Sequence, residues 1–84
     1  MSVELVLSEA LSSIVASIEL ADDNDIDPDV ASSLMEPVAA LLQSASREDR
    51  ERIQSLIIQA AESERNSTRK DMILSIPEGF GLLD

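Results

Sequence analysis

The residues of this chain best suited to chemistry are five aspartates that lie close together in its first half. They are Asp22, Asp23, Asp25, Asp27 and Asp29. No Lys or Arg precedes Arg47, so these carboxylates have no basic neighbour in the sequence. Carboxylates at this spacing supply oxygen ligands to a hard cation, or they form an acidic surface that attracts a basic partner.

The cation hypothesis depends on the order of oxygen-bearing side chains from Asp25 onwards. Places one, three, five, nine and twelve of a loop that resembles an EF-hand are filled by Asp25, Asp27, Asp29, Ser33 and Glu36. That loop needs glycine at its sixth place, and Val30 stands there. A β-branched residue resists the positive φ of such a turn. We therefore expect a helix-capping acidic turn, and we assign no metal site.

The residue types that carry most enzymatic chemistry are absent from the sequence, which contains neither Cys nor His. This removes the commonest general base and the ligands that transition metals prefer. Close carboxylate pairs are inevitable among seventeen acidic residues, and a catalytic acid also needs a partly buried cleft. A chain of 84 residues with one aromatic side chain rarely forms one. We predict a protein that is not an enzyme and uses no cofactor.

The net charge of −11 constrains the partners. It repels nucleic-acid phosphates and anionic membrane surfaces, so neither is expected to bind, and a basic protein is the natural complement. The sequence starts without the basic segment of a signal peptide, and no apolar run is long enough to span a bilayer. We expect a cytoplasmic protein with a single helical domain over residues 1–84.

Two predicted helices flank the aspartates. The first spans residues 3–20, and Leu5 and Val6 belong either to its core face or to a surface that receives a partner. The expected core stripe is Leu7, Leu11, Ile14 and Ile18, widened by Val3, Val15 and Leu20.

The second helix is expected to begin with Asp27 as N-cap and Pro28 as its first residue. Its stripe consists of Val30, Leu34, Val38, Leu41, Leu42 and Ala45. Pro37 deletes a hydrogen bond inside this stripe, and Ser33 to Glu36 has the form of a capping box. We expect a helical turn from Pro28, followed by a break or kink between Ser33 and Pro37.

The third and fourth helices complete an irregular antiparallel bundle of three main helices plus a short fourth. Ser46 is the expected N-cap of the third helix, whose apolar face is Ile53, Leu56, Ile57, Ala60 and Ala61. Asn66 to Thr68 stops or bends it. The short fourth helix carries Met72, Ile73 and Ile76, and Pro77 is expected to end it.

An apolar tail follows Pro77. Gly79 and Gly81 flank Phe80 and allow the backbone to turn, so the ring and the two leucines after it can fold onto a groove. The tail is either part of the core or an anchor for a partner. We expect Ile76 to dock on the bundle and Phe80, Leu82 and Leu83 to contribute to the partner contact.

Size, acidity and helicity resemble an acyl carrier protein, in which a serine that opens the second helix carries phosphopantetheine. Ser33-Leu34 is the matching pair, but Ser32 stands where that motif has Asp. A carrier-like or calcium-responsive helical module is the alternative function.

The whole character of the chain is similar to small acidic immunity proteins of bacterial toxin systems, and the stretch from Arg69 to Leu83, RKDMILSIPEGFGLL, resembles their closing segment. The resemblance implies a non-catalytic inhibitor that occupies the basic cleft of a toxin domain, and homodimerisation stays open. The expected partner-binding residues are Glu19, Asp22, Asp23, Asp25, Asp27, Asp29, Phe80, Leu82 and Leu83.

Overall fold

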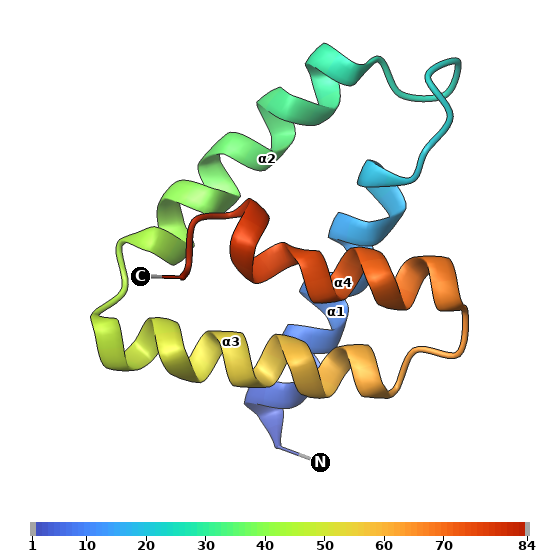
Figure 1. Ribbon diagram of the computed structural model, residues 1–84. Helices are drawn as coiled ribbons and strands as arrows, with labels where there is room; N and C mark the ends of the chain where they lie inside the picture. Colours follow the sequence, from blue (N-terminus) through green and yellow to red (C-terminus); the bar gives the residue numbers. More distant parts are fainter. Residues whose placement is uncertain (1, 84) are drawn as a thin grey trace.

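The computed structural model describes residues 2–83, which form four helices and no strand (Figure 1). The helices are α1 (Val3–Glu19), α2 (Pro28–Gln43), α3 (Arg47–Glu62) and α4 (Ser67–Gly79). The predicted all-α fold is confirmed. In Figure 1, α3 and α4 lie side by side, and α1 crosses behind both. α2 slants away from α4 towards the segment from Asp22 to Asp29, which we call the aspartate turn.

Each helix begins at a polar side chain that accepts a hydrogen bond from a backbone N–H of the first turn. The four capping residues are Ser2, Asp27, Ser46 and Asn66. The carboxylate of Asp27 accepts from the N–H of Asp29 at 2.8 Å, with Pro28 as the first helical residue, as the sequence predicts. The predicted Ser46 cap is also confirmed. Such a cap typically contributes about 1 kcal/mol to helix stability.

Two prolines lie inside continuous helices, so the expectation that Pro77 ends the fourth helix is wrong, and of the break or kink expected between Ser33 and Pro37 the break is excluded. α2 runs through Pro37 without the break expected near Ser33, and the Ser33 hydroxyl donates to the carbonyl oxygen of Asp29 at 3.0 Å instead of forming a capping box. α4 continues through Pro77 to Gly79. Pro77 is buried, so its packing in the core helps to offset the hydrogen bond that the ring removes.

The core lies where α1, α3, α4 and the tail meet, and α2 contributes Met35 to it. Its buried residues are Val15, Ala16, Met35, Ile57, Ala61, Ile73, Ile76, Phe80 and Leu82. The predicted apolar face of α3 is confirmed: four of its five residues are buried, and Ile53 is partly buried against this cluster.

The predicted core stripe of α1 is only partly confirmed. Val15 is buried and Leu11 and Ile18 pack against the core, but Leu7 and Ile14 are 63% and 58% exposed. The core side of α1 also carries the small residues Ser12 and Ala16, which have no exposed surface, and Ser12 shares the edge of a cavity with Ala60 of α3 and Ile73 of α4. Small residues allow close helix approach, and this packing outweighs the burial of the larger side chains on the opposite flank.

Hydrogen bonds from a single arginine fasten α4 to α1. The guanidinium of Arg69 donates to the backbone carbonyl of Ser13 at 3.1 Å and to the hydroxyls of Ser13 and Ser17 at 3.0 and 3.1 Å. It also donates to the carboxylate of Glu64, just after α3, at 2.9 Å. One side chain thereby joins three helical segments, which fixes the position of α4 against α1.

The apolar tail is folded onto the bundle. Gln43 donates through its side-chain amide to the carbonyl oxygen of Phe80 at 2.6 Å, and Gln54 donates to that of Leu82 at 2.8 Å. Leu82 has no exposed surface, Phe80 is 8% exposed and Leu83 is 52% exposed. The expectation that Leu82 contacts a partner is therefore corrected: its whole surface is already used by the chain's own core.

Candidate functional site

The aspartate turn links α1 to α2 and is held by its own backbone. The N–H groups of Asp25 and Ile26 donate to the carbonyl oxygen of Asp22 at 2.8 and 3.0 Å, and the carboxylate of Asp22 accepts from the N–H of Asn24 at 3.3 Å. The five aspartates are all exposed. The turn therefore presents its carboxylates to solvent from an ordered backbone.

These carboxylates do not converge on a metal. No group of three or more Asp and Glu side chains within residues 2–83 is arranged to hold a metal ion. Asp29, Ser33 and Glu36 lie along α2 rather than around a loop, because the helix begins at Pro28. The same geometry places Ser33 well inside α2, whereas the carrier-protein resemblance implies a serine that opens the helix.

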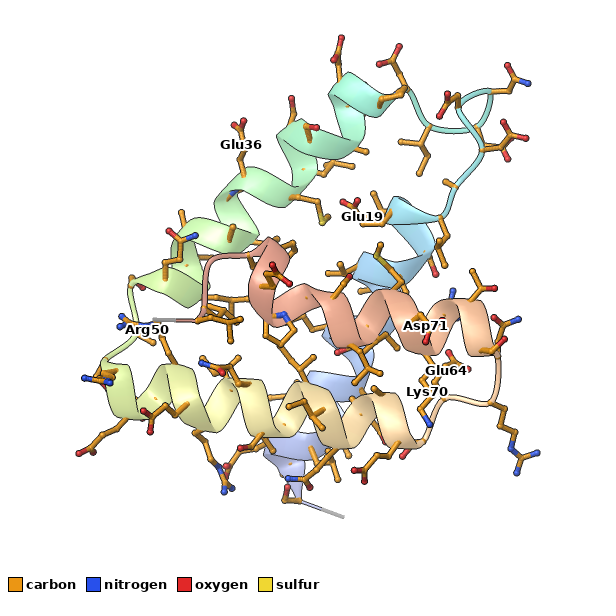
Figure 2. The ribbon with its side chains drawn as sticks, viewed as in Figure 1. Glu19, Glu36, Arg50, Glu64, Lys70 and Asp71 are labelled. Atoms are coloured by element: carbon orange, nitrogen blue, oxygen red, sulfur yellow. The ribbon has the colours of Figure 1, made fainter. Side chains whose placement is uncertain are left out.

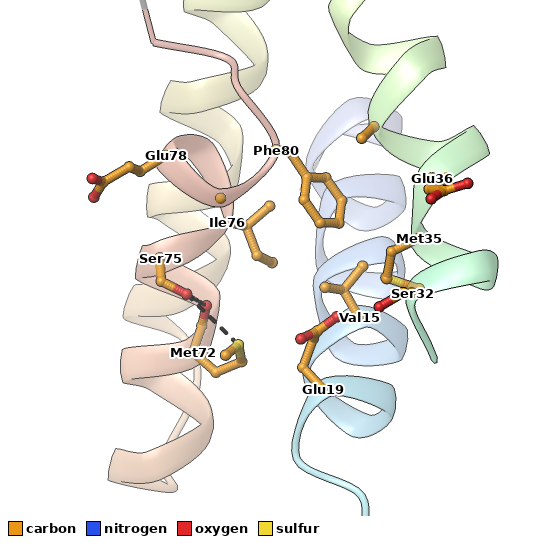
Figure 3. Close-up of a pocket in the computed structure, with 12 residues that line it drawn as sticks. Val15, Glu19, Ser32, Met35, Glu36, Met72, Ser75, Ile76, Glu78 and Phe80 are labelled. Carbon is orange, nitrogen blue, oxygen red and sulfur yellow. Dashed lines mark hydrogen bonds between the residues drawn. The ribbon is translucent and has the colours of Figure 1, made fainter. Parts of the chain in front are cut away.

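A cavity of about 680 Å³ lies between α1, α2 and α4 (Figure 3). Its lining residues include the buried or partly buried apolar side chains of Val15, Met35, Ala39, Met72, Ile76 and Phe80. We call this cavity the interhelix groove. Figure 1 shows α2 leaning away from α4.

Three exposed glutamates stand around the interhelix groove, one on each of its helices. They are Glu19 on α1, Glu36 on α2 and Glu78 on α4. Figure 2 shows the Glu19 side chain pointing from α1 towards the space beside α2. Ser32 and Ser75 add hydroxyls, and no Lys or Arg is among the lining residues described. The site is therefore an apolar trough with an acidic rim.

The structure brings two of the predicted partner-binding residues into this trough, Glu19 and Phe80. Four of the five aspartates lie in the connection after α1, starting with Asp22 three residues beyond Glu19, and Asp29 lies in the first turn of α2. The acidic rim thus continues along the chain into the aspartate turn. Leu83 is exposed but does not line the groove.

Sequence reasoning missed most of the groove, including Met35, Met72 and the rim glutamates Glu36 and Glu78. Methionine usage was the signal available: Met35 and Met72 are the two internal methionines of the chain, and both line the groove together with its sole aromatic ring. Flexible, polarizable Met side chains occur often on surfaces that adapt to a partner.

A second cavity, of about 200 Å³, lies between α1 and α3 and is polar. The hydroxyl of Ser12 and one carboxylate oxygen of Glu9 are buried at its edge and have no hydrogen-bond partner among the described residues. Both atoms accept hydrogen bonds, and a water molecule satisfies such groups in a cavity of this kind. This smaller space suits solvent better than a macromolecular partner.

The outer flanks of α1 and α2 each leave large apolar side chains exposed. On α1 they are Val3, Val6, Leu7 and Ile14, and on α2 they are Val30, Leu34 and Leu41. Each set repeats at helical spacing, so each forms a stripe beside the row that faces the core. Val6 thus lies on the surface, whereas Leu5 is partly buried.

No protein-family model, curated protein or solved structure matches this chain. Within residues 2–83, none of the helices has the length and apolar character needed to cross a membrane.

Proposed function

We propose that this chain is a non-catalytic protein-binding protein whose acidic face holds a basic partner, and that it acts as an immunity protein that neutralises a bacterial toxin by occupying the toxin's basic cleft. The observation that carries the proposal is the continuous run of exposed carboxylates from Glu19 through the aspartate turn, in a half of the chain without Lys or Arg.

The uneven distribution of basic residues along the chain supports this function over the alternative that the acidic residues only keep the protein in solution. All six basic residues lie from Arg47 onwards, and ion pairs join Arg47 to Glu51 at 3.7 Å, Arg52 to Glu4 at 2.9 Å and Arg69 to Glu64 at 2.9 Å. None of these three pairs involves an aspartate of the turn. A one-signed surface steers an oppositely charged protein and disfavours acidic competitors.

The test is affinity capture from the native host with two tagged proteins, the natural chain and a variant with Asn at all five aspartates of the turn. Asp27→Asn keeps a good N-cap, so α2 should still form. We expect the natural chain to retain a basic protein that the variant loses. Retention of the same protein by both forms would show that the turn is not the binding surface. Growth protection on co-expression with that protein then tests toxin neutralisation.

A further inference from the structure

The interhelix groove has a floor that suits apolar side chains delivered by a partner. Met35 and Phe80 are each 8% exposed, and Met72 is partly buried beside them. In Figure 3 these side chains and Ile76 project into the space between α4 and the α1–α2 pair. A trough that contains two methionines and one aromatic ring adapts its shape to an inserted side chain at little cost in rotamer strain.

The rim selects the charge of that partner. Glu19 extends from α1 towards the trough, whereas the side chains of Glu36 and Glu78 point away from it at the outer edges of α2 and α4 (Figure 3). An apolar segment flanked by acids, or a fatty acid with its own carboxylate, would be repelled at this acidic edge. A segment flanked by Lys or Arg gains ion pairs with these exposed carboxylates.

We propose that the interhelix groove receives an amphipathic α-helix from the partner, with apolar residues at i, i+3, i+4 and i+7 in the trough. Lys or Arg residues on both sides of that stripe would pair with Glu19 beside the trough and with Glu36 and Glu78 at its outer edges. This is the helix-in-groove mode of recognition. The inference rests on the proposed function only for the identity of the partner as a basic protein.

A second copy of the chain fits this site poorly. The two helices that expose apolar stripes, α1 and α2, contain no Lys or Arg, so either stripe would bring acids such as Glu4 or Asp29 to an acidic rim. Each copy also carries a net charge of −11. The chain's own tail is not the occupant, because Gln43 and Gln54 hold its carbonyl groups against the bundle.

The probe for the test is a fluorescein-labelled peptide of about 18 residues, roughly 27 Å long as a helix, with Leu at the four stripe positions and Lys between them. Its controls have the same composition with the stripe scrambled, and the same stripe with Glu in place of Lys. Fluorescence anisotropy at about 0.15 M salt, where the Debye length is about 8 Å, gives the Kd. We expect the striped Lys peptide to bind at least about tenfold more tightly than either control.

Two neighbouring alanines of α2 provide matched protein variants. Ala39 lines the groove, and Ala40, the next residue, is exposed and lies off it. Ala39→Arg places a cation at the trough, so the peptide affinity should fall about tenfold or more, which is about 1.4 kcal/mol. Ala40→Arg changes the net charge equally and should alter the affinity by less than about threefold. Equal effects of the two substitutions would overturn the proposal.

A triple rim variant, E19Q/E36Q/E78Q, covers the case in which Ala39→Arg fails to fold, as judged by circular dichroism. Its matched control, E48Q/E51Q/E62Q, removes three exposed charges from α3. We expect the rim variant to lose most of the preference for the Lys peptide and the control to keep it. A loss of the same size in both would mean that net charge alone attracts the peptide and would contradict the inference.

Sedimentation of the natural chain and the two arginine variants decides between the partner helix and a second copy. A dimer that Ala39→Arg abolishes and Ala40→Arg preserves would make a second copy the occupant and overturn the proposal. A native partner that is lost with the asparagine variant of the turn but binds Ala39→Arg normally would leave the proposed function intact and refute the groove. Peptide binding in the groove without any basic native partner would support the groove and refute the proposed function.

Discussion

Gly81 is the one residue of the described chain, 2–83, with a positive φ, 69°. A Cβ at this position would also lie 2.8 Å from the side-chain nitrogen of Gln43. That nitrogen donates the hydrogen bond to the Phe80 carbonyl oxygen. A side chain at position 81 would therefore both strain the backbone and displace this hydrogen bond. The two glycines near the end of the chain therefore differ sharply in what they tolerate.

We expect Gly81→Ala to lower the free energy of unfolding by about 1–2 kcal/mol, because alanine rarely adopts this φ. Gly79→Ala should leave stability unchanged or raise it by up to about 1 kcal/mol, since no atom lies within 4 Å of its added Cβ and the residue is helical. Urea unfolding of both variants checks the pair. Equal destabilisation would show that Gly81 is not conformationally required.

Hydrogen bonds favour the ionised form of Glu64. The hydrogen bond from the Arg69 guanidinium holds the pKa of Glu64 below its ordinary value of 4.5, and the Asn66 N–H, which donates at 3.2 Å, adds to this. A lowered folded-state pKa stabilises the fold above the ordinary pKa, and this contribution disappears as the pH falls through the lower folded value.

Glu64→Gln should therefore lower the melting temperature at neutral pH, and the difference from the natural chain should shrink once the pH falls below about 4.5. Thermal unfolding followed by circular dichroism from pH ~7 to pH ~3 measures this difference. A difference that stays constant across the range would mean that the Glu64 charge does not contribute through Arg69.

At the scale of elements, the tail behaves as a fifth structural segment rather than a free anchor. It follows α4 without a linker, and its backbone carbonyls are bound from α2 and α3. Removing residues 79–84 should accordingly cost much of the stability, the opposite of what a mobile anchor would show. Adjacent leucines in the tail allow a cleaner test than deletion.

Leu82→Ala should lower the free energy of unfolding by about 2–5 kcal/mol, because the side chain is fully buried. Leu83→Ala should change it by less than about 0.5 kcal/mol, since this side chain is half exposed. Chemical denaturation of both single variants provides the comparison. If Leu82→Ala changed the free energy of unfolding only slightly, the tail would not belong to the core, and the interpretation as a docking anchor would be favoured.

Local signals in the sequence predicted two of the helix starts correctly, and tertiary packing decided much of what they missed. Asp27 and Ser46 cap the helices as expected, because a cap depends on residues within one turn. Pro37 and Pro77 do not end their helices, since the surrounding packing outweighs one lost hydrogen bond. Leu7 is exposed because α1 has more large apolar residues than its core face accommodates.

The interhelix groove was beyond prediction for a related reason. Its walls come from α1, α2 and α4, which are far apart in the sequence, and its presence depends on the angle at which α2 leaves the aspartate turn. Helical periodicity identifies which residues share one face of a helix, but it does not give the angle between helices. Glu19 and Phe80 were named from charge and ring size alone, and the fold brings both to the groove.

At the scale of the whole molecule, charge is divided unevenly along the chain. Residues 1–42 contain nine acids and no Lys or Arg, whereas residues 43–84 contain eight acids and all six basic residues. Association with a basic partner should therefore slow markedly as salt rises, by about tenfold or more between ~0.01 M and ~1 M, where the Debye length falls from about 30 Å to about 3 Å. Dissociation should change far less. Stopped-flow mixing with the captured partner measures both rates. An association rate that does not depend on salt concentration would contradict electrostatic steering.

Phe80 is the single aromatic residue of the sequence, and its ring lies in the wall of the interhelix groove. Every aromatic proton resonance from a side chain of this protein therefore originates at that one place. A simple proton NMR spectrum, without isotopes or assignment, reports the surroundings of the groove directly. Because the chain has no Trp or Tyr, it is also nearly transparent at 280 nm, so the absorbance of a bound partner stands out against it.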